Sequence, residues 1–142
     1  MFETPPKTIA DLMTKKLLAV APEDEIGHIL ERMTELRFAH LPVVEGKKLV
    51  GLVSEKDLLH ASSSFLSAEA TKRDELIGHT KVKTIMQTEV ITAAPTDELA
   101  EIGRVMHESR IGCVPVVKDG ELVGIVTEKD FVRLAVYLLA TR

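Results

Sequence analysis

The hydrophobic and polar positions of this chain follow one pattern twice, at an offset of 73 residues. When Ile9–Leu58 is aligned with Val82–Phe131, 19 of the 50 positions are identical. In each copy a short helical turn ends at a methionine, Met13 or Met86. Two copies of one supersecondary unit generally bury their apolar faces against each other. The sequence therefore predicts two repeats packed with pseudo-two-fold symmetry, with two equivalent clefts between them.

Each copy predicts the element order β-α-β-β-α, which is a mixed α/β (α+β) fold. The first strand is short and apolar, Leu17–Val20 or Val90–Ala93. A helix is expected next, because apolar residues recur there at helical spacing. The acidic pairs Asp24-Glu25 and Asp97-Glu98 are expected to open this helix, where acidic groups suit the positive end of the helix dipole.

Two further strands and a closing helix complete each copy. The strands are almost wholly apolar, and turns that contain glycine and charged residues join them as hairpins. The closing helices are expected to start at Glu55 and Glu128. The predicted strands are His40–Val44, Leu49–Val53, Cys113–Val117 and Leu122–Val126.

The repeats are expected at residues 8–61 and 81–139, joined by a linker at 62–80, and together they should form one compact module. Ser62–Ser64 indicates a loop, and residues 68–77 indicate either a short helix or a mobile segment. The tail Phe131–Arg142 predicts a helix that is apolar on nearly all sides. It covers the sheet or forms half of a dimer interface, and the small number of neighbours of a terminal helix favours the interface.

Composition narrows the function classes. A net charge of −4 argues against a general nucleic-acid binder, which usually has a basic excess. No apolar run reaches the roughly 20 residues that span a bilayer, and the start of the chain lacks the features of a signal peptide. The single cysteine, Cys113, cannot form an internal disulfide, which indicates a reducing, cytoplasmic environment.

Two segments could carry binding chemistry, because each copy has a strand end followed by a hydroxyl residue and, three positions later, an aspartate. The pairs are Ser54 with Asp57 and Thr127 with Asp130. One interpretation is a capping box that satisfies the free amides of the helix start. The other is a ligand site, where amides and hydroxyl meet a phosphate and the aspartate accepts both hydroxyls of a ribose. Duplication would copy either arrangement, so both interpretations stay open.

The chain resembles a tandem pair of cystathionine β-synthase (CBS) domains. The resemblance rests on the methionine turns, the proline before each first helix, the segments Leu41–Val44 and Val114–Val117, and both glycine-apolar-apolar-Ser/Thr-x-x-Asp motifs. It implies a non-catalytic regulatory or energy-sensing module that binds an adenosine-containing ligand between the repeats. AMP, ADP and ATP are expected first, with S-adenosylmethionine or NAD as less favoured ligands and no required cofactor.

The resemblance also implies roles for particular residues. Asp57 and Asp130 would hold ribose, and Ser54 and Thr127 would contact ribose or phosphate. Further residues would sandwich the adenine: Leu52, Ile125, Val20, Ala21, Ala93 and Ala94. His40 and Cys113 occupy equivalent positions beside the clefts, although partial burial in a strand is the favoured explanation for both.

Other interpretations of the sequence remain open. Arg37 and Arg110 either reach a phosphate or complement a helix end. No histidine or cysteine spacing indicates a metal site, and no catalytic constellation can be read. The main alternative to a sensor is a ligand-free dimerisation scaffold whose Ser/Thr-x-x-Asp motifs are only caps. A homodimer and a regulated partner protein are expected for the sensor.

Overall fold

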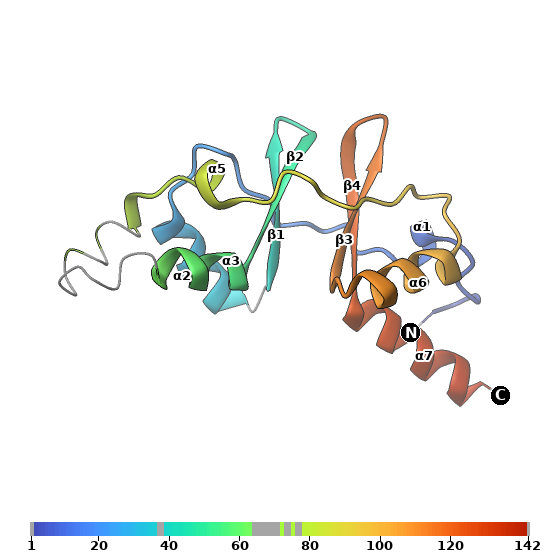
Figure 1. The fold of residues 1–142 in the computed structure, drawn as a ribbon. Helices are drawn as coiled ribbons and strands as arrows, with labels where there is room; N and C mark the ends of the chain where they lie inside the picture. Colours follow the sequence, from blue (N-terminus) through green and yellow to red (C-terminus); the bar gives the residue numbers. More distant parts are fainter. Residues whose placement is uncertain (1, 37–38, 64–71, 73–74, 76–77, 142) are drawn as a thin grey trace. The chain divides into compact units, whose positions relative to one another are not determined.

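The chain is described here by a computed structural model, which places residues 2–36, 39–63, 72, 75 and 78–141 (Figure 1). It divides into two compact units. Unit 1 combines Met1–Leu17 with Ile91–Arg142, and unit 2 is Leu18–Val90. Each unit contains one β-hairpin and three helices among its described residues, in agreement with a mixed α/β fold.

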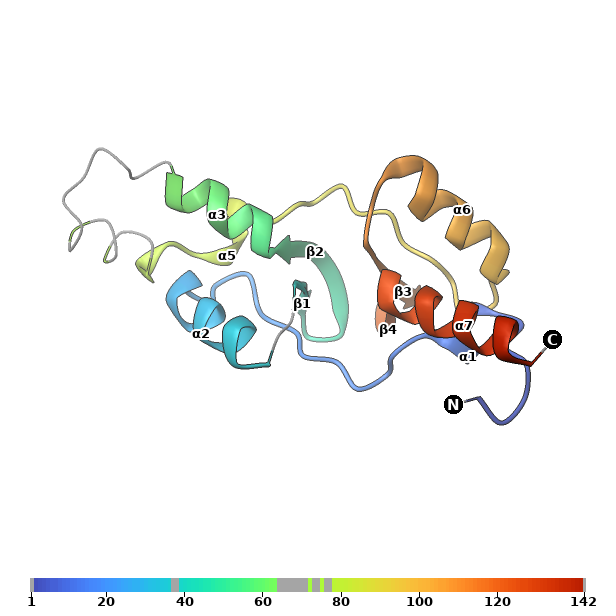
Figure 2. The ribbon, with the colours of Figure 1, turned by 90° about the horizontal axis from the view of Figure 1, so that it is seen from below.

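Unit 2 is built on the hairpin β1 (His40–Glu45) and β2 (Lys48–Ser54). Two helices, α2 (Ile26–Leu36) and α3 (Glu55–Ser63), contact each other and lie on the same side of this hairpin (Figures 1 and 2). The short helix α5 (Val82–Ile85) contacts both α3 and β2. It comes from the second sequence repeat, so unit 2 is completed by the start of the other copy.

Unit 1 has the equivalent elements, and in this unit the short helix comes from the first repeat. Its hairpin is β3 (Cys113–Lys118) with β4 (Glu121–Thr127), and its longer helices are α6 (Leu99–Ser109) and α7 (Glu128–Ala140). The short helix α1 (Ile9–Leu12), from the first repeat, contacts α7 and β4. Each methionine turn thus packs in the unit built from the other repeat.

Equivalent backbone hydrogen bonds attach these exchanged helices. In unit 1 the Ile9 amide donates to the Asp97 carbonyl at 2.9 Å, and in unit 2 the Val82 amide donates to the Asp24 carbonyl at 2.9 Å. Because the same bonds occur in both units, the exchange is a property of the repeat and not of one copy.

The two hairpins have matching registers and two-residue loops. Gly46 opens one loop with φ +63°, and Asp119 and Gly120 form the other with φ of 53° and 81°. The second loop therefore has the two positive φ angles of a type I′ turn, which suits the twist of the strands it joins.

Each hairpin turns one face to its own helices. In β1–β2 this face carries Leu41, Val43 and Val53, which are fully buried with residues of α2 and α3. In β3–β4 the equivalent residues are Val114, Val116 and Val126. Side chains alternate along a strand, so the intervening residues point to the other face.

Three sequence predictions need correction. Leu17–Val20 and Val90–Ala93 are not strands: only Val20 and Ala93 form a bridge, parallel to Val43 and Val116 respectively. The segments leave the sheet after one bridged residue because an Ala-Pro turn follows. Of the acidic pairs, Glu25 and Glu98 directly precede α2 and α6, but Asp24 and Asp97 lie in these turns, where each carboxylate accepts the amide of the alanine three residues earlier at 2.8 Å.

The third correction concerns the predicted loop at Ser62–Ser64, because Ser62 and Ser63 continue α3. Ser64 and most of residues 68–77 lie outside the described residues. The predicted starts of the closing helices at Glu55 and Glu128 are confirmed, and the four main strands are confirmed to within one residue at either end.

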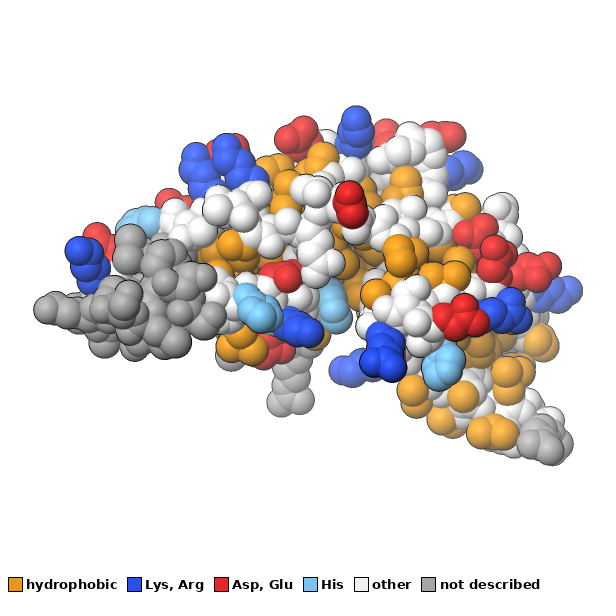
Figure 3. Space-filling model, in the orientation of Figure 1, with side chains coloured by type: hydrophobic (Ala, Val, Ile, Leu, Met, Phe, Trp, Pro, Cys, Tyr) orange, Lys and Arg blue, Asp and Glu red, His pale blue; other side chains and the backbone are white. Residues whose placement is uncertain are grey.

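The tail helix α7 is only partly covered. Leu134 is buried, but hydrophobic side chains gather on its surface at the lower right of Figure 3. Val132, Val136 and Leu139 are 62%, 49% and 63% exposed, and their spacing puts them on one stripe of the helix. Among the described residues, no helix has the length and apolar character needed to cross a bilayer.

Candidate functional site

In unit 2 the Ser/Thr-x-x-Asp motif lies at the junction of β2 and α3. Asp57 Oδ2 accepts the Ser54 amide at 2.8 Å and the Ser54 hydroxyl at 2.9 Å. The Asp57 amide in turn donates to Ser54 Oγ at 3.1 Å. This reciprocal pair is a capping box, and it fixes the carboxylate against the helix start.

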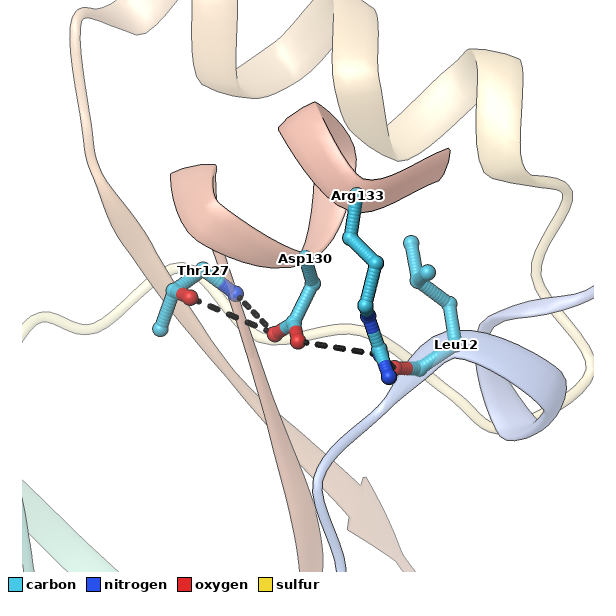
Figure 4. Close-up of polar contacts among 4 residues, drawn as sticks. All are labelled: Leu12, Thr127, Asp130 and Arg133. Carbon is cyan, nitrogen blue, oxygen red and sulfur yellow. Dashed lines mark hydrogen bonds and ion pairs between the residues drawn. The ribbon is translucent and has the colours of Figure 1, made fainter. Parts of the chain in front are cut away.

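In unit 1 the motif at the junction of β4 and α7 repeats this arrangement (Figure 4). Asp130 Oδ2 accepts the Thr127 amide at 2.8 Å and its hydroxyl at 3.3 Å. Asp130 is buried at 7% exposure, as is Ser54 at 9% in the other unit. The capping interpretation of the motif is therefore correct for both copies.

Capping uses only one oxygen of each aspartate. Oδ1 of Asp130 meets Arg133 Nη2 at 3.3 Å, and Oδ1 of Asp57 meets Gln87 Nε2 at 3.3 Å. An ionised carboxylate has about four lone-pair sites, so Oδ1 retains acceptor capacity while Oδ2 serves the cap. Capping and ribose binding are thus compatible in one side chain.

The hairpin residues predicted to surround the ligand share one face of each hairpin with a proline that was not predicted, Pro42 or Pro115. His40 lies opposite Ser54 in the β1–β2 register, and Pro42 lies opposite Leu52. All four point away from the face that carries Leu41 and Val43. The equivalent residues in unit 1 are Cys113, Pro115, Ile125 and Thr127.

The residues before the Ala-Pro turns occupy a different environment. Val20 and Ala93 are 4% exposed and belong to the helix-covered cores. Ala21 and Ala94 are partly exposed, and their amides are held by Asp24 and Asp97. Ala21 and Ala94 are therefore the members of the pairs Val20-Ala21 and Ala93-Ala94 that lie nearer to solvent.

The two motif glycines serve packing. A Cβ at Gly51 would lie 2.7 Å from Met86 Sδ, and one at Gly124 would lie 2.5 Å from Met13 Sδ. The space beside each glycine is therefore filled by the methionine of the exchanged turn. This explains why glycine and methionine recur together in both repeats.

Cys113 is a buried thiol. Burial, with a smaller effect from the negative charge of Asp130, raises its pKa to about 12. The thiol is therefore protonated at neutral pH, which makes it a weak nucleophile and a poor metal ligand. Within the described part of the chain, no group of three or more His, Cys, Asp or Glu residues could hold a metal ion.

The sequence analysis missed two residues at these carboxylates, Gln87 and Arg133. The three-residue spacing from Asp130 could have indicated Arg133, because residues three apart on a helix are neighbours. Gln87 reaches Asp57 only because its segment pairs with β2, through reciprocal bonds between Gln87 and Leu52 at 2.8 and 3.0 Å. Of the two predicted arginines, Arg110 ends α6 in the left-handed conformation with φ 56°, and Arg37 lies outside the described residues.

Comparisons with known proteins agree with this architecture. The family model for the CBS domain matches residues 9–64 and 82–137. A crystal structure assigned to the acetoin utilization protein AcuB of Vibrio cholerae is 34% identical with a TM-score of 0.82, over 94% of this chain and 93% of that chain.

Two similar structures contain ligands. CBSX2 in complex with AMP is 29% identical with a TM-score of 0.79, over 96% of this chain and 100% of that one. The domain pair of protein MJ0100 in complex with 5′-methylthioadenosine and S-adenosyl-L-methionine is 26% identical with a TM-score of 0.76, over 90% and 98% of the two chains.

Some relatives are much longer. The chain is 31% identical to inosine-5′-monophosphate dehydrogenase of Korarchaeum cryptofilum and matches 26% of its length. It matches 46% of the protein MJ1225 of Methanocaldococcus jannaschii, with 30% identity.

Proposed function

Because the chain belongs to the CBS domain family and carries two copies of that domain, we propose that it is a non-catalytic regulatory module for an adenine nucleotide, AMP, ADP or ATP. The observation that carries the proposal is the pair of aspartates whose Oδ2 caps a helix while Oδ1 remains outside the cap. The ligands of CBSX2 and MJ0100 support an adenosine-containing compound.

In this proposal the ribose hydroxyls donate to Oδ1 of Asp57 or Asp130. Ser54 and Thr127 place their hydroxyls beside the same ligand. Further residues are assigned to the adenine and its surroundings, namely Leu52, Val20, Ala21 and His40 in unit 2, and Ile125, Ala93, Ala94 and Cys113 in unit 1. For Val20 and Ala93 the contact would come from the backbone, since their side chains belong to the cores.

Regulation requires that the ligand bind two states of the module with different affinity. The proposed output is a change in a second copy of this chain or in a partner protein, in the cytoplasm. The apolar stripe of Val132, Val136 and Leu139 on α7 supports a homodimer, because exposed apolar patches commonly mark protein interfaces.

A ligand-free scaffold is the second candidate, and the completed capping boxes favour it. A scaffold would need Asp57 and Asp130 only for helix stability. The two candidates therefore differ in what a change of Oδ1 alone should do.

Substitution by asparagine separates the two roles. Asp57→Asn keeps one oxygen for the Ser54 amide but replaces the second acceptor with an amide NH2 donor, so the cap survives and the ribose site is damaged. Asp57→Ala removes both. Loss of hydrogen bonds to a charged acceptor should cost about 1.5–3 kcal/mol of binding, which is roughly a 10–100-fold weaker affinity.

The assay is titration calorimetry with AMP, ADP, ATP, S-adenosylmethionine and NAD, paired with thermal unfolding of the ligand-free chain. The matched control is Asp11→Ala, which breaks the equivalent capping box of Thr8 in the other unit. The sensor predicts weaker binding for Asp57→Asn at nearly unchanged stability, and intact binding at the Asp57 site for Asp11→Ala. If the wild-type chain ignores all five compounds at millimolar concentration, the scaffold is correct.

A further inference from the structure

The two aspartates have different partners at Oδ1. Asp130 meets the guanidinium of Arg133, whereas Asp57 meets the neutral amide of Gln87. At the offset of 73 residues, Arg133 corresponds to His60 and Gln87 corresponds to Thr14. The difference therefore lies in the sequence of the copies and not only in side-chain placement.

Arg133 is held beside Asp130 by contacts on several sides. Nη2 donates to the Leu12 carbonyl at 3.2 Å as well as to Asp130, as Figure 4 shows. The guanidinium lies 4.8 Å from the centre of the Phe2 ring, a cation–π distance. Phe2 packs edge-on against Tyr137 with ring centres 5.4 Å apart. The cation is thus positioned by α1 and the N-terminal segment, and half of its side chain remains exposed.

The charged residues at the starts of α3 and α7 also differ. In α7, Glu128 and Asp130 are balanced by Lys129 and Arg133, which leaves no net charge on these four side chains. In α3, residues 55–60 contain the carboxylates Glu55 and Asp57 and one lysine, Lys56, and His60 takes the sequence position of Arg133.

A ribose-binding carboxylate repels a phosphate attached to the same ribose, and a neighbouring fixed cation offsets that repulsion. We propose that Arg133 is a specificity-determining residue, which makes the Asp130 site select adenosine ligands that carry phosphate over the uncharged nucleoside. The Asp57 site, where Oδ1 meets the neutral amide of Gln87, discriminates less between them. This inference rests on the proposed function.

The experiment isolates each site by disabling the other with an asparagine. In the Asp57→Asn background, affinities for adenosine and AMP are measured for wild-type Arg133, Arg133→Gln and Arg133→Lys. The matched control is Arg133→Gln in the Asp130→Asn background. Measurements are made at pH 8, where histidine side chains are generally neutral, and unfolding curves confirm that each variant is folded.

Arg133→Gln is expected to weaken AMP binding at the Asp130 site roughly tenfold and to change adenosine affinity less than about twofold. Arg133→Lys should restore part of the AMP affinity, because it keeps the charge without the planar fork. The control should show no change for either ligand. Higher salt should reduce the AMP preference of the wild-type residue, because ions screen exposed charges.

Three results would overturn the inference. Equal weakening of adenosine and AMP would make Arg133 a structural support only, and unchanged or tighter AMP binding would contradict a charge role directly. If neither site binds any adenosine compound, the proposed function itself has failed, and that outcome is visible in the wild-type chain before any variant is tested.

Discussion

Replacement of Gly51 by alanine tests the packing of the exchanged turn against the hairpin. The new Cβ would lie 2.7 Å from Met86 Sδ and 2.9 Å from the Gln87 carbonyl oxygen. The methionine can turn away, but the carbonyl is backbone and is held by the Leu52 amide at 3.0 Å. Gly124→Ala meets Met13 Sδ at 2.5 Å, but its nearest backbone oxygen, that of Thr14, is 3.2 Å away.

The expected loss in the free energy of unfolding depends on which of the contacting atoms can move. Overpacking of a tight core costs about 1–3 kcal/mol, and loss of glycine's unfolded-state entropy returns roughly 0.5–1 kcal/mol. Gly51→Ala should lie near the upper end, because a backbone bridge must shift. Gly124→Ala should cost about 1 kcal/mol less, since only atoms of the flexible Met13 side chain lie within 3.0 Å of its new Cβ.

Urea unfolding of the two variants measures these free energies, with Gly78→Ala as the control. A Cβ at Gly78, which is helical, would meet nothing within 4 Å, so this change should be neutral or stabilise by up to about 1 kcal/mol. Met86→Ala in the Gly51→Ala background should recover only part of the loss. If Gly51→Ala is as harmless as the control, or cheaper than Gly124→Ala, the argument from backbone contact is wrong.

Three further predictions concern single side chains. The native Cys113 thiol, with its pKa raised to about 12, should react with a disulfide reagent at pH 8 roughly 1000-fold more slowly than in urea, and rapid native labelling would contradict its burial. The pKa of Glu23 is lowered to about 2, by Lys81 first and Lys83 second, so its contribution is present above pH 4.5 and lost as the pH falls towards 2. Glu23→Gln should therefore melt below the wild type at pH 6 but with it at pH 2, and a pH-independent difference would refute the ion pairs. Val136→Glu should shift sedimentation towards the monomer at unchanged unfolding free energy, because this side chain is 49% exposed; a dimer that persists places the interface elsewhere.

The boundaries of the helices and strands show how much of the secondary structure the sequence pattern predicts. The hairpin strands were predicted to within one residue and the closing helices at their first residue, because alternating burial and the Ser/Thr-x-x-Asp boundaries are local features of the sequence. Leu17–Val20 failed as a strand because an apolar run does not reveal how many of its residues find a pairing partner. Of the predicted pair Asp24-Glu25, only Glu25 directly precedes the helix, because the Asp24 carboxylate accepts the Ala21 amide of the preceding turn at 2.8 Å.

The sequence by itself determined the duplication, the mixed fold, the family and the positions of the two aspartates, because each is expressed in local spacing or direct identity. Only the tertiary structure decided which oxygen each carboxylate gives to its helix and which partner the other oxygen meets. Arg133 is seated by Leu12 and Phe2, and Gln87 by a bridge to Leu52. Such contacts join residues 30 to 131 positions apart, and a distance in space between them cannot be obtained from the order of residues along the chain.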